Sequence, residues 1–141
     1  MEFKSQICTT VEQSKRLLEL GLKKKTADMY YTNAGLPFIK DEFHLECKSF
    51  KELSNNLSKI SPFTFIPAWS LHRLIELMPE VIFEALLCVF KDSIRYEALV
   101  FDRIEVLNDV VSDNIYNNAI ATIEWLINKG YFNQDYLEEK K

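Results

Sequence analysis

Glycine and proline are scarce in this chain, with three and four residues among 141, which excludes collagen-like and low-complexity proteins. Three glycines are also too few for the glycine-rich loops that cradle phosphates in P-loop and dinucleotide-binding proteins. No run of 18 apolar residues occurs, so we expect no transmembrane helix. The start of the chain contains charges and no apolar run follows it, so we expect no signal peptide and a cytoplasmic location.

Cysteine is limited to Cys8, Cys47 and Cys88, an odd number of widely spaced residues with no C-x-x-C pair. Such a pattern does not suit a disulfide framework, and it favours free thiols in a reducing compartment.

The chain also lacks an excess of basic residues, because 17 Lys and Arg stand against 21 Asp and Glu, a net charge of -4. Residues 1–70 hold ten basic and eight acidic side chains (+2), whereas residues 71–141 hold seven and thirteen (-6). Non-specific nucleic-acid binding needs a basic face, so we expect no general nucleic-acid binding.

The bulk composition is that of a folded protein. Apolar residues make up 48% of the chain and charged residues 27%, a balance typical of globular proteins. The length is sufficient for a sizeable core, and no linker divides the chain. We therefore expect a single compact domain over residues 1–141.

The first helix is predicted by its capping residues. A capping box is formed by Thr9 with Glu12 or by Thr10 with Gln13, because the hydroxyl and the later side chain satisfy each other's backbone N–H groups. Gly21 can adopt the left-handed conformation that ends a helix.

Two further helices have clear ends. Ser70 is a typical N-cap and Pro79 stops the second helix. Ser112 or Asp113 is expected to cap the last helix, which Gly130 ends.

Residues 26–66 give weaker patterns. Thr26 is predicted to be the N-cap of one short helical turn, and residues 38–47 suggest a hairpin. Residues 48–61 have helical spacing. Residues 63–66 lie between prolines, so they are expected to be extended or looped.

Residues 86–107 predict a small antiparallel meander. Strands are expected at 86–90 and 94–101 around a turn at 91–93, with a third strand at 104–107. Alternation places one set of side chains on a common face: Ile94, Tyr96, Ala98 and Val100. The predicted fold class is α+β, with three or four helices packed on a small antiparallel sheet of two to four strands.

Four sequence blocks occur in a fixed order: CTTVEQS at 8–14, TADM at 26–29, WSLHRLIELMP at 69–79 and IEWLINKGY at 123–131. In this order they resemble a family of small uncharacterised proteins of gut bacteria, often carried in mobile elements or prophages. The resemblance implies a single cytosolic α+β domain without an established activity, so it assigns no functional residues. Residues 33–66 do not match the family pattern, and a specificity loop there would be particular to this chain.

The sequence contains no G-x-S-x-G, H-E-x-x-H, P-loop or G-x-G-x-x-G motif. His44 and Cys47, with Cys8 and His72, could supply four zinc ligands, but their spacing matches no common zinc site. On a strand, His44 and Cys47 would also point to opposite faces. We therefore predict no metal site and no cofactor.

Cys8 precedes a helix start, which could lower the pKa of its thiol and make it a nucleophile with His44 or His72 as base. The alternative is a small buried side chain that fixes the entry of the chain into the helix. The latter is favoured. The carboxylate pairs, such as Asp109 with Asp113, are interpreted as solvating and capping groups, so no catalytic residue is predicted.

Candidate binding residues are aromatic. Tyr30 and Tyr31 follow a run of three lysines at residues 23–25. Proteins that bind single-stranded nucleic acids use this combination of cations and aromatic rings. Trp69 follows a phenylalanine-rich loop and could line a ligand or partner pocket, although a core position is the alternative. Tyr30, Tyr31 and Trp69 are therefore the predicted ligand- or partner-binding residues.

The leading functional hypothesis is a non-catalytic accessory protein that binds another protein. The alternative is a module that binds or sequesters a small molecule, such as a nucleotide. The sequence does not decide the oligomeric state, since either a sheet edge or the apolar stripe of residues 71–78 could form a dimer.

Overall fold

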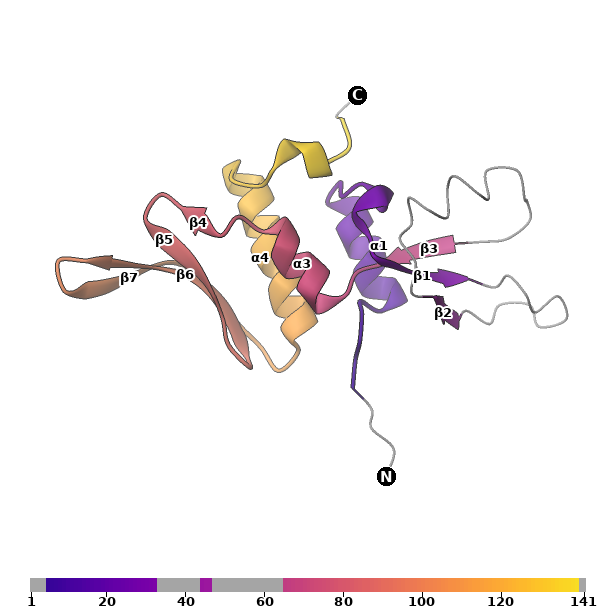
Figure 1. Ribbon diagram of the computed structural model, residues 1–141, viewed down its shortest axis with the longest axis horizontal. Helices are drawn as coiled ribbons and strands as arrows, with labels where there is room; N and C mark the ends of the chain where they lie inside the picture. Colours follow the sequence, from indigo (N-terminus) through magenta and orange to yellow (C-terminus); the bar gives the residue numbers. More distant parts are fainter. Residues whose placement is uncertain (1–4, 33–43, 47–64, 140–141) are drawn as a thin grey trace, which may run out of the picture.

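A computed structural model describes residues 5–32, 44–46 and 65–139 of the chain. Within these residues, three α-helices lie between two antiparallel sheets, as Figure 1 shows. The helices are α1 (Val11–Glu19), α3 (Leu71–Leu77) and α4 (Ile115–Lys129). Short 3-10 helices occupy Lys24–Thr26 and Gln134–Tyr136. None of the helices in these residues is long and apolar enough to cross a membrane.

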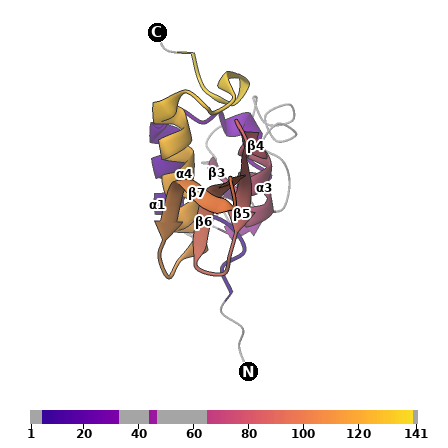
Figure 2. The ribbon, with the colours of Figure 1, turned by 90° about the vertical axis from the view of Figure 1, so that its left-hand side faces the viewer.

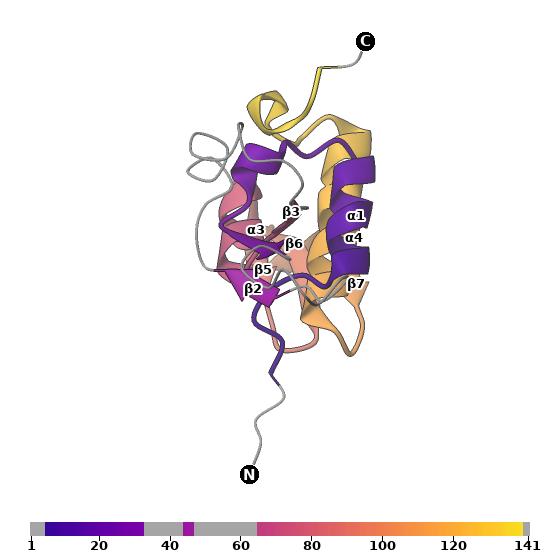
Figure 3. The same cartoon turned by 90° about the vertical axis from the view of Figure 1, so that its right-hand side faces the viewer.

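The first sheet has the strand order β2-β1-β3 and the second the order β4-β5-β6-β7. Strands β1, β2 and β3 span Met29–Thr32, His44–Glu46 and Phe65–Ala68 (Figure 3). The second sheet consists of β4 (Val81–Ile82), β5 (Ala85–Val89), β6 (Ser93–Val100) and β7 (Arg103–Val111). The α+β prediction is confirmed, although the strands form two sheets on opposite sides of the helices instead of one.

Helix α1 begins as its capping residues predict. Thr10 accepts a hydrogen bond from the Gln13 N–H, and the Gln13 side chain accepts one from the Thr10 N–H. After the helix, Gly21 has a φ of +101°, a left-handed value that glycine adopts without a steric penalty. The predicted helix start and end are both confirmed.

The other two helices are also confirmed, with one correction. Ser70 caps α3 by accepting from the Arg73 N–H at 3.1 Å. Neither Ser112 nor Asp113 is the N-cap of α4, because Asn114 fills that position and accepts from two backbone N–H groups. The Ser112 hydroxyl is instead bonded to the side chain of Asn118.

The predicted helical turn after Thr26 is wrong. Thr26 ends a 3-10 turn, in which its hydroxyl bonds the Lys23 carbonyl at 2.7 Å, and β1 follows from Met29. The residues of β1 alternate between half-buried and buried, as in a strand with one face in the core. Two adjacent tyrosines suit a strand better than a helical turn, which explains the error.

Other predictions fall partly outside the described residues. The hairpin at 38–47 is described only for β2, and the helix predicted at 48–61 is not described. Residues 65 and 66 are extended in β3, as predicted. The meander is confirmed, but β7 is longer than the predicted strand at 104–107, and β4 was not predicted.

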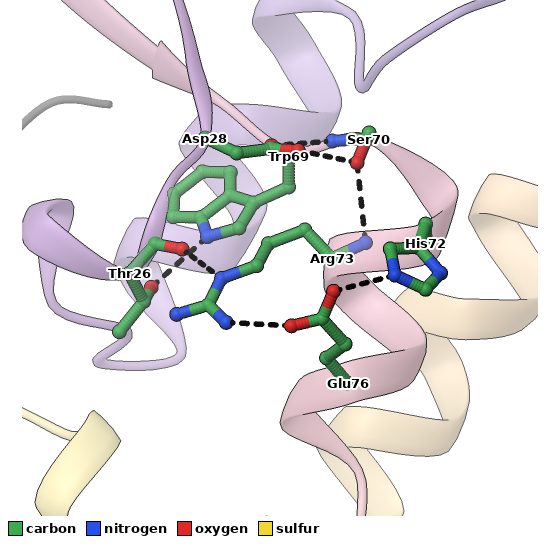
Figure 4. A network of polar contacts seen from close by, with 7 residues as sticks. All are labelled: Thr26, Asp28, Trp69, Ser70, His72, Arg73 and Glu76. Carbon is green, nitrogen blue, oxygen red and sulfur yellow. Dashed lines mark hydrogen bonds and ion pairs between the residues drawn. The ribbon is translucent and has the colours of Figure 1, made fainter. Parts of the chain in front are cut away.

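The buried indole of Trp69 joins the first sheet to the helices. Its side chain is fully buried, and its ring N–H donates to the Thr26 hydroxyl at 2.9 Å (Figure 4). Its backbone N–H donates to the Thr9 hydroxyl at 3.0 Å, and its carbonyl accepts from the Thr9 N–H at 2.9 Å. Trp69 therefore connects the entry to α1, the approach to β1 and the end of β3.

Asp28 and Arg73 extend this network around Trp69. The Asp28 carboxylate accepts from both the backbone N–H and the hydroxyl of Ser70, so it fixes the cap of α3. Arg73 donates from Nε to the Thr26 carbonyl at 2.7 Å and pairs with Glu76 at 3.1 Å. The network holds α3 against the segment between α1 and β1.

The four-stranded sheet has one covered face. The predicted common face of β6 is confirmed, because Ile94, Tyr96 and Ala98 are buried and α4 packs on β6 and β7. Figure 2 looks onto the sheet from the side away from the helices. Leu107 is an extra residue in β7, since Asn108 pairs with Tyr96 whereas Val106 pairs with the next residue of β6.

Replacing Thr26 by valine tests the network around Trp69. The substitution keeps the shape of the side chain but leaves the buried indole N–H without an acceptor, so we expect the free energy of unfolding to fall by about 1–3 kcal/mol. Denaturant unfolding measures the change. Thr26→Ser keeps the hydroxyl and should lose clearly less, so equal losses in the two variants would contradict the role of the hydrogen bond.

Candidate functional site

Of the three predicted binding residues, two lie in the core. Trp69 is fully buried, and Tyr30 is 5% exposed with its ring edge-to-face against Phe65 at 5.7 Å. Tyr31 is half-buried, and its hydroxyl donates to the Thr9 carbonyl at 2.9 Å. Burial, followed by the hydrogen bond with the Cys8 thiol, raises the pKa of Tyr31. These positions agree with the core alternative, and a binding role for the three residues stays a prediction.

The lysines that precede these aromatic residues differ from them in exposure to solvent. Lys24 and Lys25 are exposed on the 3-10 turn, whereas Tyr30 and Trp69 are buried. A ligand could therefore not stack on either ring as the residues stand.

The structure also shows the positions of Cys8 and His72, the described residues considered as catalytic groups or metal ligands. Cys8 is 3% exposed with its Sγ 3.3 Å from the Tyr31 hydroxyl, which agrees with the buried alternative. His72 is exposed on α3 and pairs with Glu76 at 2.7 Å. Among the described residues, no three His, Cys, Asp or Glu side chains are grouped to hold a metal ion. Cys47 and the side chain of His44 lie outside the description.

A different part of the molecule has features that the fold alone does not explain. The β4–β5 turn at residues 83–84 and the β6–β7 turn at residues 101–102 lie at the same end of the four-stranded sheet. Strands β6 and β7 continue beyond β5, and their turn is the part of the sheet farthest from the helices in Figure 1. We call residues 98–105 the arm.

Each turn carries an exposed phenylalanine in a left-handed backbone conformation. Phe83 has a φ of 56° and is 78% exposed; Phe101 has a φ of 48° and is 95% exposed. For a residue with a side chain this conformation costs about 1–2 kcal/mol, and two-residue hairpin turns prefer asparagine and glycine. Strain of this kind is concentrated at functional sites, so the two phenylalanines point to a role in binding.

A groove of about 520 Å³ lies between the β4–β5 turn and strands β6 and β7, on the covered side of the sheet. Apolar side chains dominate it, and two exposed glutamates stand among them. Within the described residues, neither glutamate takes part in an ion pair. The groove residues are Ile82, Phe83, Glu84, Ala85, Ala98, Val100, Glu105 and Leu107.

A row of aromatic rings connects the groove to the core. Phe83 contacts Tyr131 edge-to-face at 5.6 Å, and Tyr131 contacts Trp125 at 5.7 Å. Trp125 in turn lies 5.9 Å from the buried Tyr96, whose hydroxyl donates to the Pro79 carbonyl at 2.7 Å. Burial raises the pKa of Tyr96, so its phenol stays protonated and keeps this bond. Phe83 is therefore attached to the core although most of its ring is exposed.

This arrangement suits recognition more than catalysis. The groove offers apolar contacts and two carboxylates, but no nucleophile and no histidine among its lining residues. The sequence does contain a signal for it: Phe-Asp stands at residues 101–102, where a tight hairpin turn usually has Asn-Gly. Recognising that signal requires the pairing of β6 with β7, because the turn is defined only by the strands that flank it.

Comparisons with known proteins add no assignment: no family model, no curated protein and no solved structure matches this chain. The groove and the exposed side chains of Phe83 and Phe101 are therefore the features of the molecule that bear on its function.

Replacing Phe101 by asparagine tests whether the strained turn serves the fold. Asparagine tolerates the left-handed conformation and Phe101 is almost fully exposed, so the free energy of unfolding should stay the same or rise by up to about 1 kcal/mol. Phe132→Ala is the matched control, since Phe132 is 2% exposed and its truncation should cost about 3–5 kcal/mol. A clear loss of stability in Phe101→Asn would mean that the turn has a structural role.

Proposed function

We propose that the chain is a non-catalytic protein that binds another protein through the groove, with Phe83 and Phe101 as its anchors. The observation that carries this proposal is the pair of exposed phenylalanines held in strained turns on the same end of the sheet. Exposed aromatic side chains next to an apolar groove are typical of protein-binding surfaces. Such residues lower the solubility of a protein unless a partner covers them.

The charge of the groove suggests the chemistry of the partner. Glu84 and Glu105 line it, Asp102 lies in the adjacent turn, and residues 71–141 have a net charge of -6. We therefore propose that the occupant is a short protein segment with apolar side chains flanked by lysine or arginine. Its apolar side chains would contact Ala98 and Val100, and its cations the two glutamates.

A membrane surface is the less favoured occupant. Exposed phenylalanines at loop tips can enter a bilayer, but anionic lipids attract lysine and arginine. In the arm and its neighbouring turn, Glu84, Asp102 and Glu105 outnumber the single cation Arg103. The local field would repel an anionic bilayer, which supports a protein partner.

The resemblance of residues 8–131 to mobile-element proteins supports the wider setting of this proposal. An accessory protein of such an element, located in the cytoplasm, would have proteins of its bacterial host within reach. A small-molecule ligand remains the second candidate, because a groove of about 520 Å³ falls in the range of ligand pockets.

The proposal is tested by selecting phage-displayed random peptides on the unaltered protein. We expect the enriched peptides to combine apolar residues with lysine or arginine. Glu105→Lys should weaken their binding by about tenfold or more, because it replaces attraction by repulsion in the groove. Glu12→Lys is the matched control, since Glu12 is an exposed glutamate on α1 and its reversal should leave peptide binding unchanged.

Three results would contradict the proposal. Peptides that bind Glu105→Lys as well as the unaltered protein would place the site elsewhere. Binding to anionic vesicles that is lost in Phe101→Asn, without peptide selection, would favour the membrane. A small molecule found bound by native mass spectrometry, and lost in Ala98→Arg, would favour the second candidate.

A further inference from the structure

The floor of the groove contains a row of side chains that crosses all four strands of the second sheet. The register places Ile82 beside Ala85 and Ala98 beside Glu105, and the pairing of β5 with β6 brings Ala85 next to Ala98. All four residues line the groove. The row therefore runs from an aliphatic side chain on β4 to a carboxylate on β7, an edge strand of the sheet.

The middle of this row carries the smallest side chains of the groove. Ala85 is 1% exposed and Ala98 is 9% exposed, so both methyl groups lie low among their neighbours. Three larger apolar side chains also line the groove: Phe83, Val100 and Leu107. A large apolar side chain of a partner therefore has room above the two alanines, where it would contact the larger side chains as well.

The two glutamates of the groove lie on opposite sides of this space. Neighbouring strands are about 4.8 Å apart, so a point midway between Ala85 and Ala98 is about 7 Å from the backbone of Glu105. Glu84 precedes Ala85 in the β4–β5 turn, and its backbone lies about 6 Å from the same point in the other direction. Both glutamates are exposed, and the nearby Arg103 forms an ion pair with neither of them.

These distances match the repeat of an extended chain. Successive residues of an extended segment are about 3.3 Å apart and alternate side chains point to the same side, so positions i and i+2 are about 6.6 Å apart. A side chain placed above the two alanines would thus have its second neighbour in each direction near one of the glutamates. The five residues of such a pattern span about 13 Å, close to the three strand intervals of about 14 Å that separate Ile82 from Glu105.

From this geometry we infer that the groove binds an extended segment with the pattern basic-x-apolar-x-basic. The apolar side chain enters the space above Ala85 and Ala98, and the lysine or arginine residues two positions away contact Glu84 and Glu105. The inference rests on the proposed function, and it adds the conformation and the residue spacing of the partner segment. A helical partner would need a different spacing, because neighbours on one face of a helix are three or four positions apart.

Three phage-displayed peptide libraries, mixed in equal amounts and selected on the unaltered protein, test the spacing. Every peptide has one fixed leucine and two fixed lysines, and all other positions are random. The lysines stand two positions from the leucine in the first library, next to it in the second and three positions away in the third. We expect sequencing to show the first library enriched at least about threefold over each of the others, since exposed ion pairs contribute modestly.

Reversing both charges of the groove should exchange this preference. We expect the variant with Glu84→Lys and Glu105→Lys to enrich a library in which glutamates replace the lysines at the same two positions, by at least about threefold over the lysine library. Both side chains are exposed, so the fold should tolerate the change. The matched control is Glu12→Lys with Glu19→Lys, two exposed positions on α1, which should keep the preference for lysine.

The outcomes separate this inference from the proposed function. Equal enrichment of the three lysine libraries, with binding of the selected peptides lost in Glu105→Lys, would overturn the spacing and leave the proposed function standing. Enrichment of the third library would indicate a helical partner and would also overturn the inference. If neither these libraries nor fully random peptides are enriched, both the inference and the proposed function fail.

Discussion

The indole of Trp69 joins three segments that are distant in the sequence, because its ring and backbone each find a partner on a different segment. The ring N–H needs the Thr26 hydroxyl, and the backbone groups need Thr9. A buried donor without a partner is costly, so these segments can only pack in one arrangement. Asp28 and Arg73 then fix α3 to the same network, and α4 packs against α1 and α3.

The network around Trp69, which holds the core together, lies apart from the proposed binding surface. The helices and the three-stranded sheet meet around Trp69, whereas the arm extends from the other sheet on the far side of α4. The arm contributes few buried side chains, so the core places little constraint on its sequence. That division explains how the chain tolerates two phenylalanines in left-handed turns, whose strain is offset by packing elsewhere.

Local chemistry predicted the parts of the fold that depend on neighbouring residues. The capping box of Thr10 and Gln13 and the glycine at the end of α4 follow from hydrogen bonds within a few residues. The choice of Asn114 over Ser112 as N-cap was not predictable in this way, because Ser112 is engaged by Asn118 one helical turn further on. Two sheets in place of one result from pairing β1 with β3, whose partners Tyr30 and Pro67 are far apart in the sequence.

The candidate site was harder to predict than the fold. Tyr30, Tyr31 and Trp69 were predicted as binding residues because they are aromatic and lie near lysines or prolines in the sequence. The sequence does not reveal which of these rings tertiary packing will bury. The groove depends on which residues of β7 face α4, and that depends on the strand register. In the sequence, Phe83 and Phe101 look like ordinary apolar residues of strands. Only the positions of the turns show that they are exposed.

The extra residue in β7 decides which chemistry each side of the arm presents. If β6 and β7 continued past Asn108 in unbroken register, Val106 would lie opposite Ala98 and Ile104 opposite Val100. Both aliphatic side chains would then turn into the groove, and Glu105 would move to the opposite side of the sheet, beside Leu99. The groove would keep Glu84 but lose Glu105, and the opposite side of the sheet would gain that carboxylate. One inserted leucine thus decides which side chains of β7 line the groove and which lie on the opposite side of the sheet.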